Sequence, residues 1–209
     1  MSTIVPDPYT LGLWCADKYW WSSSIGISNT DAQLVKRFAE FLLKVLPEER
    51  LRLRIYFPPD SSLGVRPDRY LLNLVGKVSV TQAEKLKKIG YHLYVNSRPL
   101  LRIFRAAEMA IAEFKAEQIS AYLAGRFDGD GSINPSMEEE FRIVYTTIQE
   151  ARQDRKLLER IGIKQVSVYA YRKINTYALY VKKDDVPRLV RLLKPYSLKL
   201  SRLSLPRRD

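Results

Sequence analysis

The same order of predicted secondary structure runs twice along the 209 residues, and this repeat constrains the fold more than any other feature of the sequence. Each copy contains a helix, two strands, a helix, two strands and a helix. The copies are most alike where 94–104 aligns with 180–193, since each has a strand followed by a helix with proline near its start. We therefore predict an α+β fold built from a tandem duplicated αββαββα unit, with 1–116 and 117–209 as its halves.

The spacing of apolar residues defines the individual elements. Residues 31–46 place Leu34, Phe38 and Leu42 on one side of a helix that Asp31 can cap. Residues 50–57 alternate between polar and apolar side chains, which is typical of a strand with one buried face. Further helices are predicted over 8–17, 99–114, 149–162 and 184–193, a helix running into a turn over 115–133, and strands over 24–29, 70–80, 91–96, 141–147, 164–172 and 176–181.

The charge of the chain indicates a polyanionic partner. Thirty-five Lys and Arg residues against 23 Asp and Glu give a net charge of +12, more than solubility requires for a domain of this size. Each half carries +6, so the basic character belongs to the repeated unit. No apolar run is long enough for a membrane span and the first residues lack a secretory signal, so we expect a cytoplasmic protein.

The chain has a single cysteine, Cys15, and a single histidine, His92. This composition excludes an intrachain disulfide, a cysteine-rich zinc site and a histidine-rich metal site. His92 lies in a strand-like segment, and a nucleophile activated by histidine is therefore not expected. Any metal site in this sequence would depend on oxygen ligands.

Two nine-residue segments carry the chemistry, TLGLWCADK at 10–18 and LAGRFDGDG at 123–131. Each places small residues four positions apart, Gly12 with Ala16 and Gly125 with Gly129, and this spacing gives each helix a flat stripe. Two such stripes let helix backbones pack in close contact. We expect these two helices to pack against each other.

Each segment also brings an acidic residue to the C-terminal end of its helix, Asp17 in the first and Asp130 in the second. The helix dipole disfavours a carboxylate there, and two adjacent carboxylates would force one to protonate unless a cation intervenes. Oxygen ligands without His or Cys favour a hard ion. We predict that Asp17 and Asp130 bind Mg²⁺, with Mn²⁺ as the alternative.

These motifs, the duplicated unit and the basic strands together resemble the LAGLIDADG homing endonucleases, specifically the monomeric members that carry two motifs in one chain. The second motif is the stronger match, because Lys18 stands where the family has glycine and Cys15 where an acidic residue is frequent. We expect Lys18 to resist the positive φ that glycine would adopt there. The resemblance implies an intron-encoded enzyme of archaeal type, in which two antiparallel four-stranded sheets form a saddle for double-stranded DNA and the motif helices pack at the centre.

The resemblance also implies an activity. The family cleaves both strands of a long asymmetric target, leaves short 3′ overhangs and promotes intron homing. Its motif acids bind the metal, so Asp17 and Asp130 would be catalytic here, in a hydrolysis that needs no protein nucleophile. By their position relative to the motifs, the further catalytic candidates are Asn29, Lys115, Thr146 and Lys199.

Recognition of DNA is expected from the polar faces of the strands. Arginine reads guanine through two hydrogen bonds, and Tyr, Gln and Ser reach bases or phosphates. The candidates are Ser24, Ser28, Arg50, Arg52, Arg54, Tyr56, Arg142, Gln165, Ser167, Tyr169, Tyr171, Arg172 and Lys173.

Two other functions fit the same sequence. A descendant of this fold that has lost cleavage would be a DNA-binding regulator or an RNA-splicing maturase, and RNA would be a partner only in the second case. A general nucleic-acid-binding protein would also carry basic strands. The intact acids in both motifs favour the nuclease.

Overall fold

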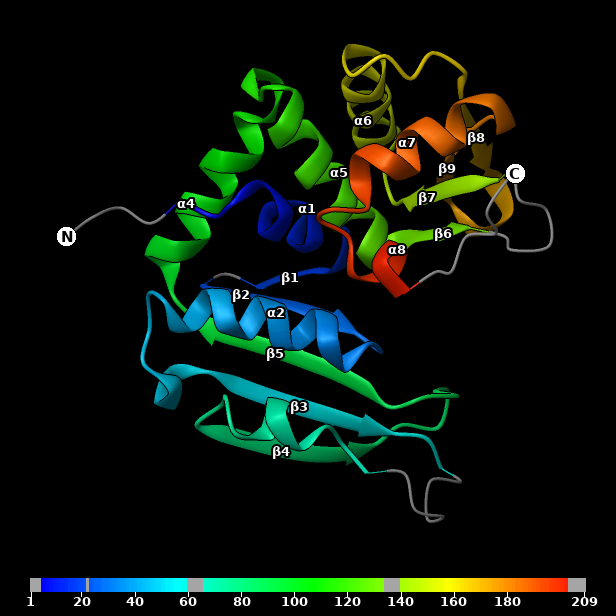
Figure 1. Cartoon of the computed structure of the whole chain (residues 1–209). Coiled ribbons are helices and arrows are strands. Elements are labelled where there is room, and N and C mark those ends of the chain that lie inside the picture. Colours follow the sequence, from blue (N-terminus) through cyan, green and yellow to red (C-terminus); the bar gives the residue numbers. More distant parts are fainter. Residues whose placement is uncertain (1–4, 22, 60–65, 134–139, 203–209) are drawn as a thin grey trace. The chain divides into compact units, whose positions relative to one another are not determined.

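The computed structural model describes residues 5–21, 23–59, 66–133 and 140–202, which form two compact units (Figure 1). The first unit contains Asp17–Ala107, and the second contains Asp7–Ala16 together with Glu108–Asp209. The first motif helix thus belongs to the second unit, because it packs there against the second motif helix. The division by contacts differs in this respect from the division at residue 116, which follows the repeat in the sequence.

The first unit has the expected strands and helices with one insertion. Its elements are β1 (Lys18–Trp21), β2 (Ser24–Asn29), α2 (Ala32–Leu43), β3 (Arg52–Phe57), α3 (Arg69–Leu72), β4 (Lys77–Gln82), β5 (Gly90–Asn96) and α4 (Arg98–Met109, whose last two residues belong to the second unit). The predicted strand over 70–80 is wrong in its first part, where Asp68 caps the short helix α3 by accepting a hydrogen bond from the Leu71 amide at 2.9 Å.

The second unit repeats this order. It contains α1 (Pro8–Asp17, with Asp17 itself in the first unit), α5 (Ala116–Asp130), β6 (Gly131–Ile133), β7 (Phe141–Tyr145), α6 (Ile148–Arg160), β8 (Val166–Tyr171), β9 (Thr176–Val181), α7 (Val186–Leu193) and α8 (Leu198–Arg202). Of these, α8 has no counterpart among the predicted helices.

The strand order confirms the duplication. The second sheet runs β6-β7-β9-β8 and is antiparallel throughout. The first sheet runs β1-β2-β5-β3-β4, so its first four strands follow the same pattern. It differs from the expected four-stranded antiparallel sheet because the insertion adds β4, which pairs parallel with β3. The part of the second sheet that the structure describes has no strand equivalent to β4.

One face of the first sheet forms the core of its unit. Ile27, Leu53 and Leu93 are buried on that face, and α2 lies along it (Figure 1). Phe38 of α2 meets Phe104 of α4 edge to face, with ring centroids 6.0 Å apart. Because side chains alternate along a strand, this burial leaves the opposite face for Arg52, Arg54 and other polar residues.

Helices α1 and α5 pack with their backbones in direct contact, as the small-residue stripes predict. A Cβ atom at Gly12 would lie 2.0 Å from the carbonyl oxygen of Tyr122, and one at Gly125 would lie 2.1 Å from that of Tyr9. No side chain larger than hydrogen fits at either position without separating the helices.

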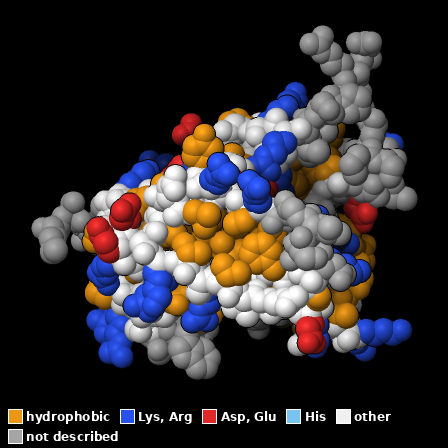
Figure 2. Space-filling view, turned by 90° about the horizontal axis from the view of Figure 1, so that it is seen from below, with side chains coloured by type: hydrophobic (Ala, Val, Ile, Leu, Met, Phe, Trp, Pro, Cys, Tyr) orange, Lys and Arg blue, Asp and Glu red, His pale blue; other side chains and the backbone are white. Residues whose placement is uncertain are grey.

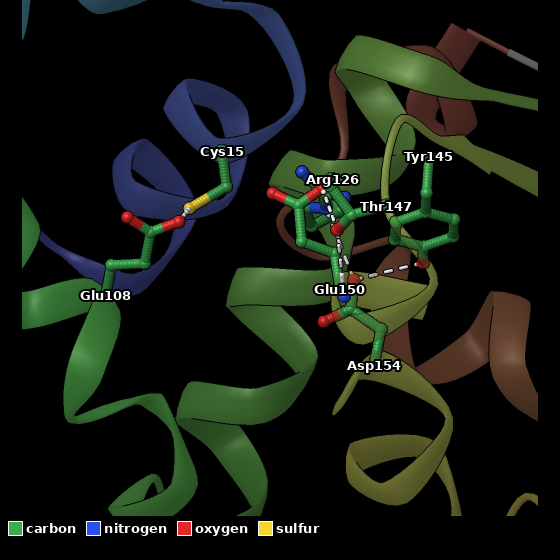
Figure 3. Close-up of polar contacts among 7 residues, drawn as sticks. All are labelled: Cys15, Glu108, Arg126, Tyr145, Thr147, Glu150 and Asp154. Carbon is green, nitrogen blue, oxygen red and sulfur yellow. Dashed lines mark hydrogen bonds and ion pairs between the residues drawn. The ribbon is translucent and has the colours of Figure 1, made fainter. Parts of the chain in front are cut away.

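A buried polar cluster beside these helices was not foreseen from the sequence. Arg126, from the second motif, forms an ion pair with Asp154 at 3.2 Å (Nε to Oδ2). The hydroxyl of Tyr145 donates to the same carboxylate oxygen at 3.0 Å, and the guanidinium lies 4.7 Å from the centre of the Tyr145 ring. Figure 3 shows these side chains converging, with Cys15 donating to Glu108 nearby. The cluster ties α5 to β7 and α6.

Candidate metal-binding and nucleic-acid-binding residues

Asp17 is held by one of the predicted catalytic residues. The Asn29 amide nitrogen, at the end of β2, donates to Asp17 Oδ2 at 2.6 Å. The side-chain oxygen of Asn29, Oδ1, in turn accepts from the backbone amide of Asp31 at 2.8 Å, which orients the side-chain amide group. The end of β2 therefore fixes the direction of the carboxylate that ends α1.

The expectation that Lys18 would have to resist a positive φ is wrong. Among the described residues, Asn175 is the one non-glycine residue with positive φ, so Lys18 enters β1 without a left-handed conformation. Gly131, its counterpart in the second motif, also leaves its helix in extended conformation, with φ of −90°. Glycine is needed there for space instead, since a Cβ atom would lie 2.5 Å from the carbonyl oxygen of Phe127.

Asp130 ends α5 in an environment that disfavours its charge. Although Asp130 is accessible to solvent, burial by the surrounding protein is the main cause that raises the pKa of its carboxyl to about 6. The positive charges of Arg126 and Lys199 act in the opposite direction, and Glu150 adds to the rise. A raised pKa of this kind is typical of functional carboxylates.

Lys199 lies beside this carboxylate. Its ammonium group donates to the carbonyl oxygens of Gly129 at 3.2 Å and Gly131 at 3.3 Å, the residues on either side of Asp130. The second motif thus has a cation bound to its backbone next to its terminal acid.

Asp128, which sequence reasoning missed, explains how Lys199 reaches this position. Its buried carboxylate accepts hydrogen bonds from the Tyr9 hydroxyl (2.6 Å) and the Ser197 hydroxyl (2.5 Å). It also accepts from the backbone amides of Leu198 (2.7 Å) and Lys199 (3.0 Å), which begin α8. One motif carboxylate therefore joins α1, α5 and α8. The only sequence signal was the acidic residue itself, two positions before Asp130.

Of the other two catalytic candidates, the structure places Lys115 far from Asp130 and Thr146 just after β7. Lys115 precedes α5, so the 15 residues of that helix separate it from Asp130 by about 22 Å at about 1.5 Å per residue. Thr146 is exposed between β7 and α6, and Thr147 rather than Thr146 caps α6 by accepting from the Glu150 amide at 3.3 Å.

The polar face of the first sheet carries the predicted arginines. Arg54 pairs across the strands with His92, and its guanidinium lies 5.1 Å from the centre of the Tyr94 ring. Arg52 and Tyr56 lie on the same face because they are two positions from Arg54 along β3. The predicted residues of β3 therefore share one face of the sheet.

The remaining candidates of the first unit lie along the same sheet. The Ser24 hydroxyl donates to the Asn96 side chain at 2.7 Å, and Arg50 donates to the Asn96 carbonyl at 2.8 Å from the turn before β3. Ser28 is exposed and pairs with His92.

His92 and its aromatic neighbours were missed among the residues of this face. The His92 ring lies edge to face with Tyr19, with centroids 4.0 Å apart, and with Tyr94 at 5.2 Å. Burial, and then the charge of Arg54, lower the pKa of His92 to about 4. The ring is therefore neutral at pH 7. Alternation along 90–96 was the signal that could have placed His92 and Tyr94 on this face.

Tyrosines dominate the polar face of the second sheet. Tyr171 and Tyr180 share a hydrogen bond between their hydroxyls at 2.6 Å, and Tyr169 packs on Tyr180 with centroids 5.5 Å apart. Tyr180 also pairs across the strands with Arg142 and with Ser167. Tyr180, which the sequence analysis did not select, is thus the residue that joins the predicted ones.

The other candidates of this unit lie at the ends of β8. Gln165 precedes the strand, and its backbone amide donates to Asp185 at 2.8 Å. Arg172 and Lys173 follow the strand in a short 3-10 turn and are exposed.

The two predicted metal ligands offer the oxygen donors that hard divalent ions prefer. Within the described ranges, no three His, Cys, Asp or Glu side chains come together to hold a metal. Isolated carboxylates with water and phosphate oxygens are the usual ligands of Mg²⁺. Asp17 and Asp130, one in each unit, supply carboxylate oxygens of this kind.

No helix in the described part of the chain is long and apolar enough to cross a membrane.

Comparisons with known proteins find similarity to one family model and to several solved structures. Residues 117–194 match the family model of the LAGLIDADG-like domain. A search of curated proteins finds no significant match.

Among solved structures, the chain is similar to I-DmoI in complex with DNA and Mn, with 17% identity, a TM-score of 0.60, and coverage of 90% of this chain and 94% of that one. It is also similar to full-length DUF199/WhiA from Thermatoga maritima, with 16% identity and a TM-score of 0.57 over 96% of this chain and 60% of that one. The N-terminal LAGLIDADG domain of DUF199/WhiA gives 17% identity and a TM-score of 0.55 over 92% of this chain and 84% of that one. Residues 117–194 are thus similar to the LAGLIDADG-like domain, and over nearly its whole length the chain has the fold of the homing endonuclease I-DmoI.

Proposed function

We propose that this protein is a site-specific, metal-dependent DNA endonuclease that acts as a monomer. It makes a double-strand break with short 3′ overhangs at a long asymmetric target and promotes intron homing. The proposal draws support from the duplicated fold, the net charge of +12 and the similarity to a homing endonuclease solved with DNA and Mn.

The observation that carries the proposal is that each motif helix ends in an acid with a polar partner beside it. Asn29 orients the Asp17 carboxylate at 2.6 Å, and Lys199 binds the backbone on both sides of Asp130. An acidic residue at the C-terminal end of a helix does not stabilise the helix, since the helix dipole disfavours a negative charge there. Stability alone would favour a basic or neutral residue in both places.

In this proposal, Asp17 and Asp130 are the protein ligands of Mg²⁺ or Mn²⁺. The bound metal supplies a water of lowered pKa and positive charge for the scissile phosphate. Asn29 keeps the Asp17 carboxylate in one direction, and Lys199 offsets negative charge near Asp130. We retain Lys115 and Thr146 as proposed catalytic residues.

The polar faces of the two sheets are proposed to bind the duplex. Arg52 and Arg54 on β3 and Arg142 on β7 supply positive charge, and the tyrosines of β8 and β9 supply planar groups with hydroxyls. Replacing Arg52 and Arg54 with alanine should flatten the salt dependence of duplex binding by about 0.9 for each phosphate that the variant no longer neutralises.

Cleavage of a plasmid library tests the function. Supercoiled plasmids that carry genomic fragments from the source of the gene are incubated with the protein and Mg²⁺, and linear products are sequenced at their ends. The proposal predicts one strongly preferred insert, cut with 3′ overhangs, and no product with excess chelator. Absence of linear products with Mg²⁺ and with Mn²⁺ across a range of temperatures would refute the nuclease.

A second function is supported by the similarity to DUF199/WhiA and by the ammonium group of Lys18 directly after Asp17. The protein would then bind nucleic acid without cleaving it, as a regulator or a splicing maturase. Tight, sequence-selective binding of duplex DNA with no cleavage would favour the regulator. Preferential binding of structured RNA would favour the maturase.

A further inference from the structure

We infer that the inserted strand β4 extends the DNA-binding face of the first sheet, with Lys77, Ser79 and Thr81 facing the duplex and the basic segment after β4 binding further phosphates. This inference rests on the proposed DNA-binding function. It assigns residues that the sequence analysis did not select.

The strand register carries the inference. In the parallel pairing of β3 with β4, Lys77 is the partner of Arg52, Ser79 of Arg54 and Thr81 of Tyr56. Cross-strand partners point to the same side of a sheet, so the polar face of β3 continues without a break onto β4. Val78 and Val80 fall on the other side, in register with the buried Leu53 and Ile55.

The exposure of β4 leaves this face accessible. All six residues of the strand are exposed. Figure 2 views the molecule from the side on which β4 lies in Figure 1, with hydrophobic side chains near the middle of that face and Lys and Arg side chains flanking them. The extra strand widens the polar face by about 4.8 Å, the spacing of neighbouring strands.

The charge of the insertion matches a phosphate backbone. Residues 66–90 contain six basic and two acidic side chains, so this segment contributes +4 to the net charge of +12. Lys85, Lys87 and Lys88 follow β4 directly and are exposed. Charged residues also protect edge strands from pairing with other chains, but that role needs no continuity with the arginine face of β3.

Among the described residues, the second sheet has no strand in the position of β4, since it ends at β8. The two sheets would therefore contact unequal lengths of duplex. This inequality gives a physical reason for an asymmetric target.

Two neighbouring substitutions on opposite faces test the inference directly. Full-length Ser79→Asp and Val80→Asp variants are titrated onto a fluorescent mixed-sequence duplex without metal, at fixed salt. Ser79→Asp should weaken binding about tenfold, equivalent to about 1.4 kcal/mol, because its carboxylate faces phosphate. Val80→Asp should change the affinity less than about twofold, well under that value. Equal effects of the two would overturn the inference.

The salt dependence of binding provides an independent measurement. A Lys77→Ala/Lys85→Ala/Lys87→Ala variant should lower the slope of log K against log salt by about 2 to 3. The matched control removes Lys44, Arg98 and Arg102, three exposed basic residues on α2 and α4 or at their ends, and should leave the slope unchanged.

The outcomes separate this inference from the proposed function. If the salt slope decreased equally in the two triple variants, or in neither, the role of β4 would be overturned. Binding of duplex DNA by the wild-type chain would still uphold the DNA-binding function in that case. Failure of the wild-type chain to bind any duplex would overturn both.

Discussion

Replacing Gly125 with alanine tests the close packing of α1 on α5. The added Cβ atom would lie 2.1 Å from the Tyr9 carbonyl oxygen and 2.6 Å from the Leu13 amide nitrogen. Both are backbone atoms of a helix, so they cannot move separately from it. The helices must shift by about 1.3 Å to restore an ordinary contact of 3.4 Å. Such overpacking costs up to about 3 kcal/mol, and the higher helix propensity of alanine returns about 1 kcal/mol.

We therefore expect Gly125→Ala to lower the free energy of unfolding by about 2 kcal/mol. Urea unfolding followed by far-UV circular dichroism measures this change as a fall in the midpoint of about 1 M, for a slope of about 2 kcal/mol/M. Gly90→Ala is the control, because the nearest atom to its added Cβ is the end of the Leu86 side chain at 3.4 Å. An unchanged or higher midpoint for Gly125→Ala would refute the backbone contact.

Three further outcomes follow from the buried polar groups. Asp128→Asn should destabilise the protein by about 3 kcal/mol and reduce hydrogen-exchange protection of the Lys199 amide, whereas unchanged protection would contradict the capping of α8. The pKa of His92 is lowered from 6.5 to about 4 in the folded protein, so between these values the unfolded chain binds a proton more readily than the folded chain does. The free energy of unfolding should therefore be at its full value above pH 6.5 and should decrease as the pH falls to about 4. The loss is at most about 3 kcal/mol, and a His92→Phe variant that kept the same pH dependence of urea unfolding would contradict this cause. Arg126→Met should lower the free energy of unfolding by about 3 to 5 kcal/mol, because it leaves Asp154 buried without its cation. If an Arg126→Met/Asp154→Leu double variant were no more stable than Arg126→Met, the unpaired Asp154 carboxylate would not be the cause of the loss.

The elements with strong local patterns could be predicted from the sequence. The amphipathic pattern of 31–46 and the alternation of 50–57 predicted α2 and β3 to within a few residues, and the stripes of Gly12 and Gly125 predicted the packing of α1 on α5. These features depend on the period of the backbone and on side-chain size, which the sequence contains directly.

Features that depend on distant partners could not be predicted. Helix α8 begins where Asp128, about 70 positions earlier, accepts the hydrogen bonds of its first amides. The pairing of Arg126 with Asp154 spans 28 positions and joins two helices. The parallel pairing of β4 with β3 was equally hidden, because the alternation of Val78 and Val80 with polar residues indicates a strand but not the strand with which it pairs.

For the candidate site, the sequence identified candidate residues more reliably than it predicted the backbone and the contacts around them. Asn29 was chosen by its position in the repeat, and it contacts Asp17. Lys18 was expected to strain the backbone on the assumption of a left-handed exit from α1, but the chain passes directly into a strand there. Solvent and substrate groups, which complete the coordination of a hard ion, leave no pattern in the sequence.

The central claim is that the two motif acids bind the metal that cleaves DNA, and the most direct measurement compares binding with cleavage in Asp17→Asn and Asp130→Asn. Asparagine keeps the size of each side chain and removes its charge. On the insert cut by the wild-type protein, each variant should bind the duplex at least as tightly as wild type, since a negative charge near phosphate is gone, and should make no double-strand break with Mg²⁺ or Mn²⁺. Cleavage by either variant at the wild-type rate would contradict the role of that acid, and cleavage by both would contradict the account as a whole.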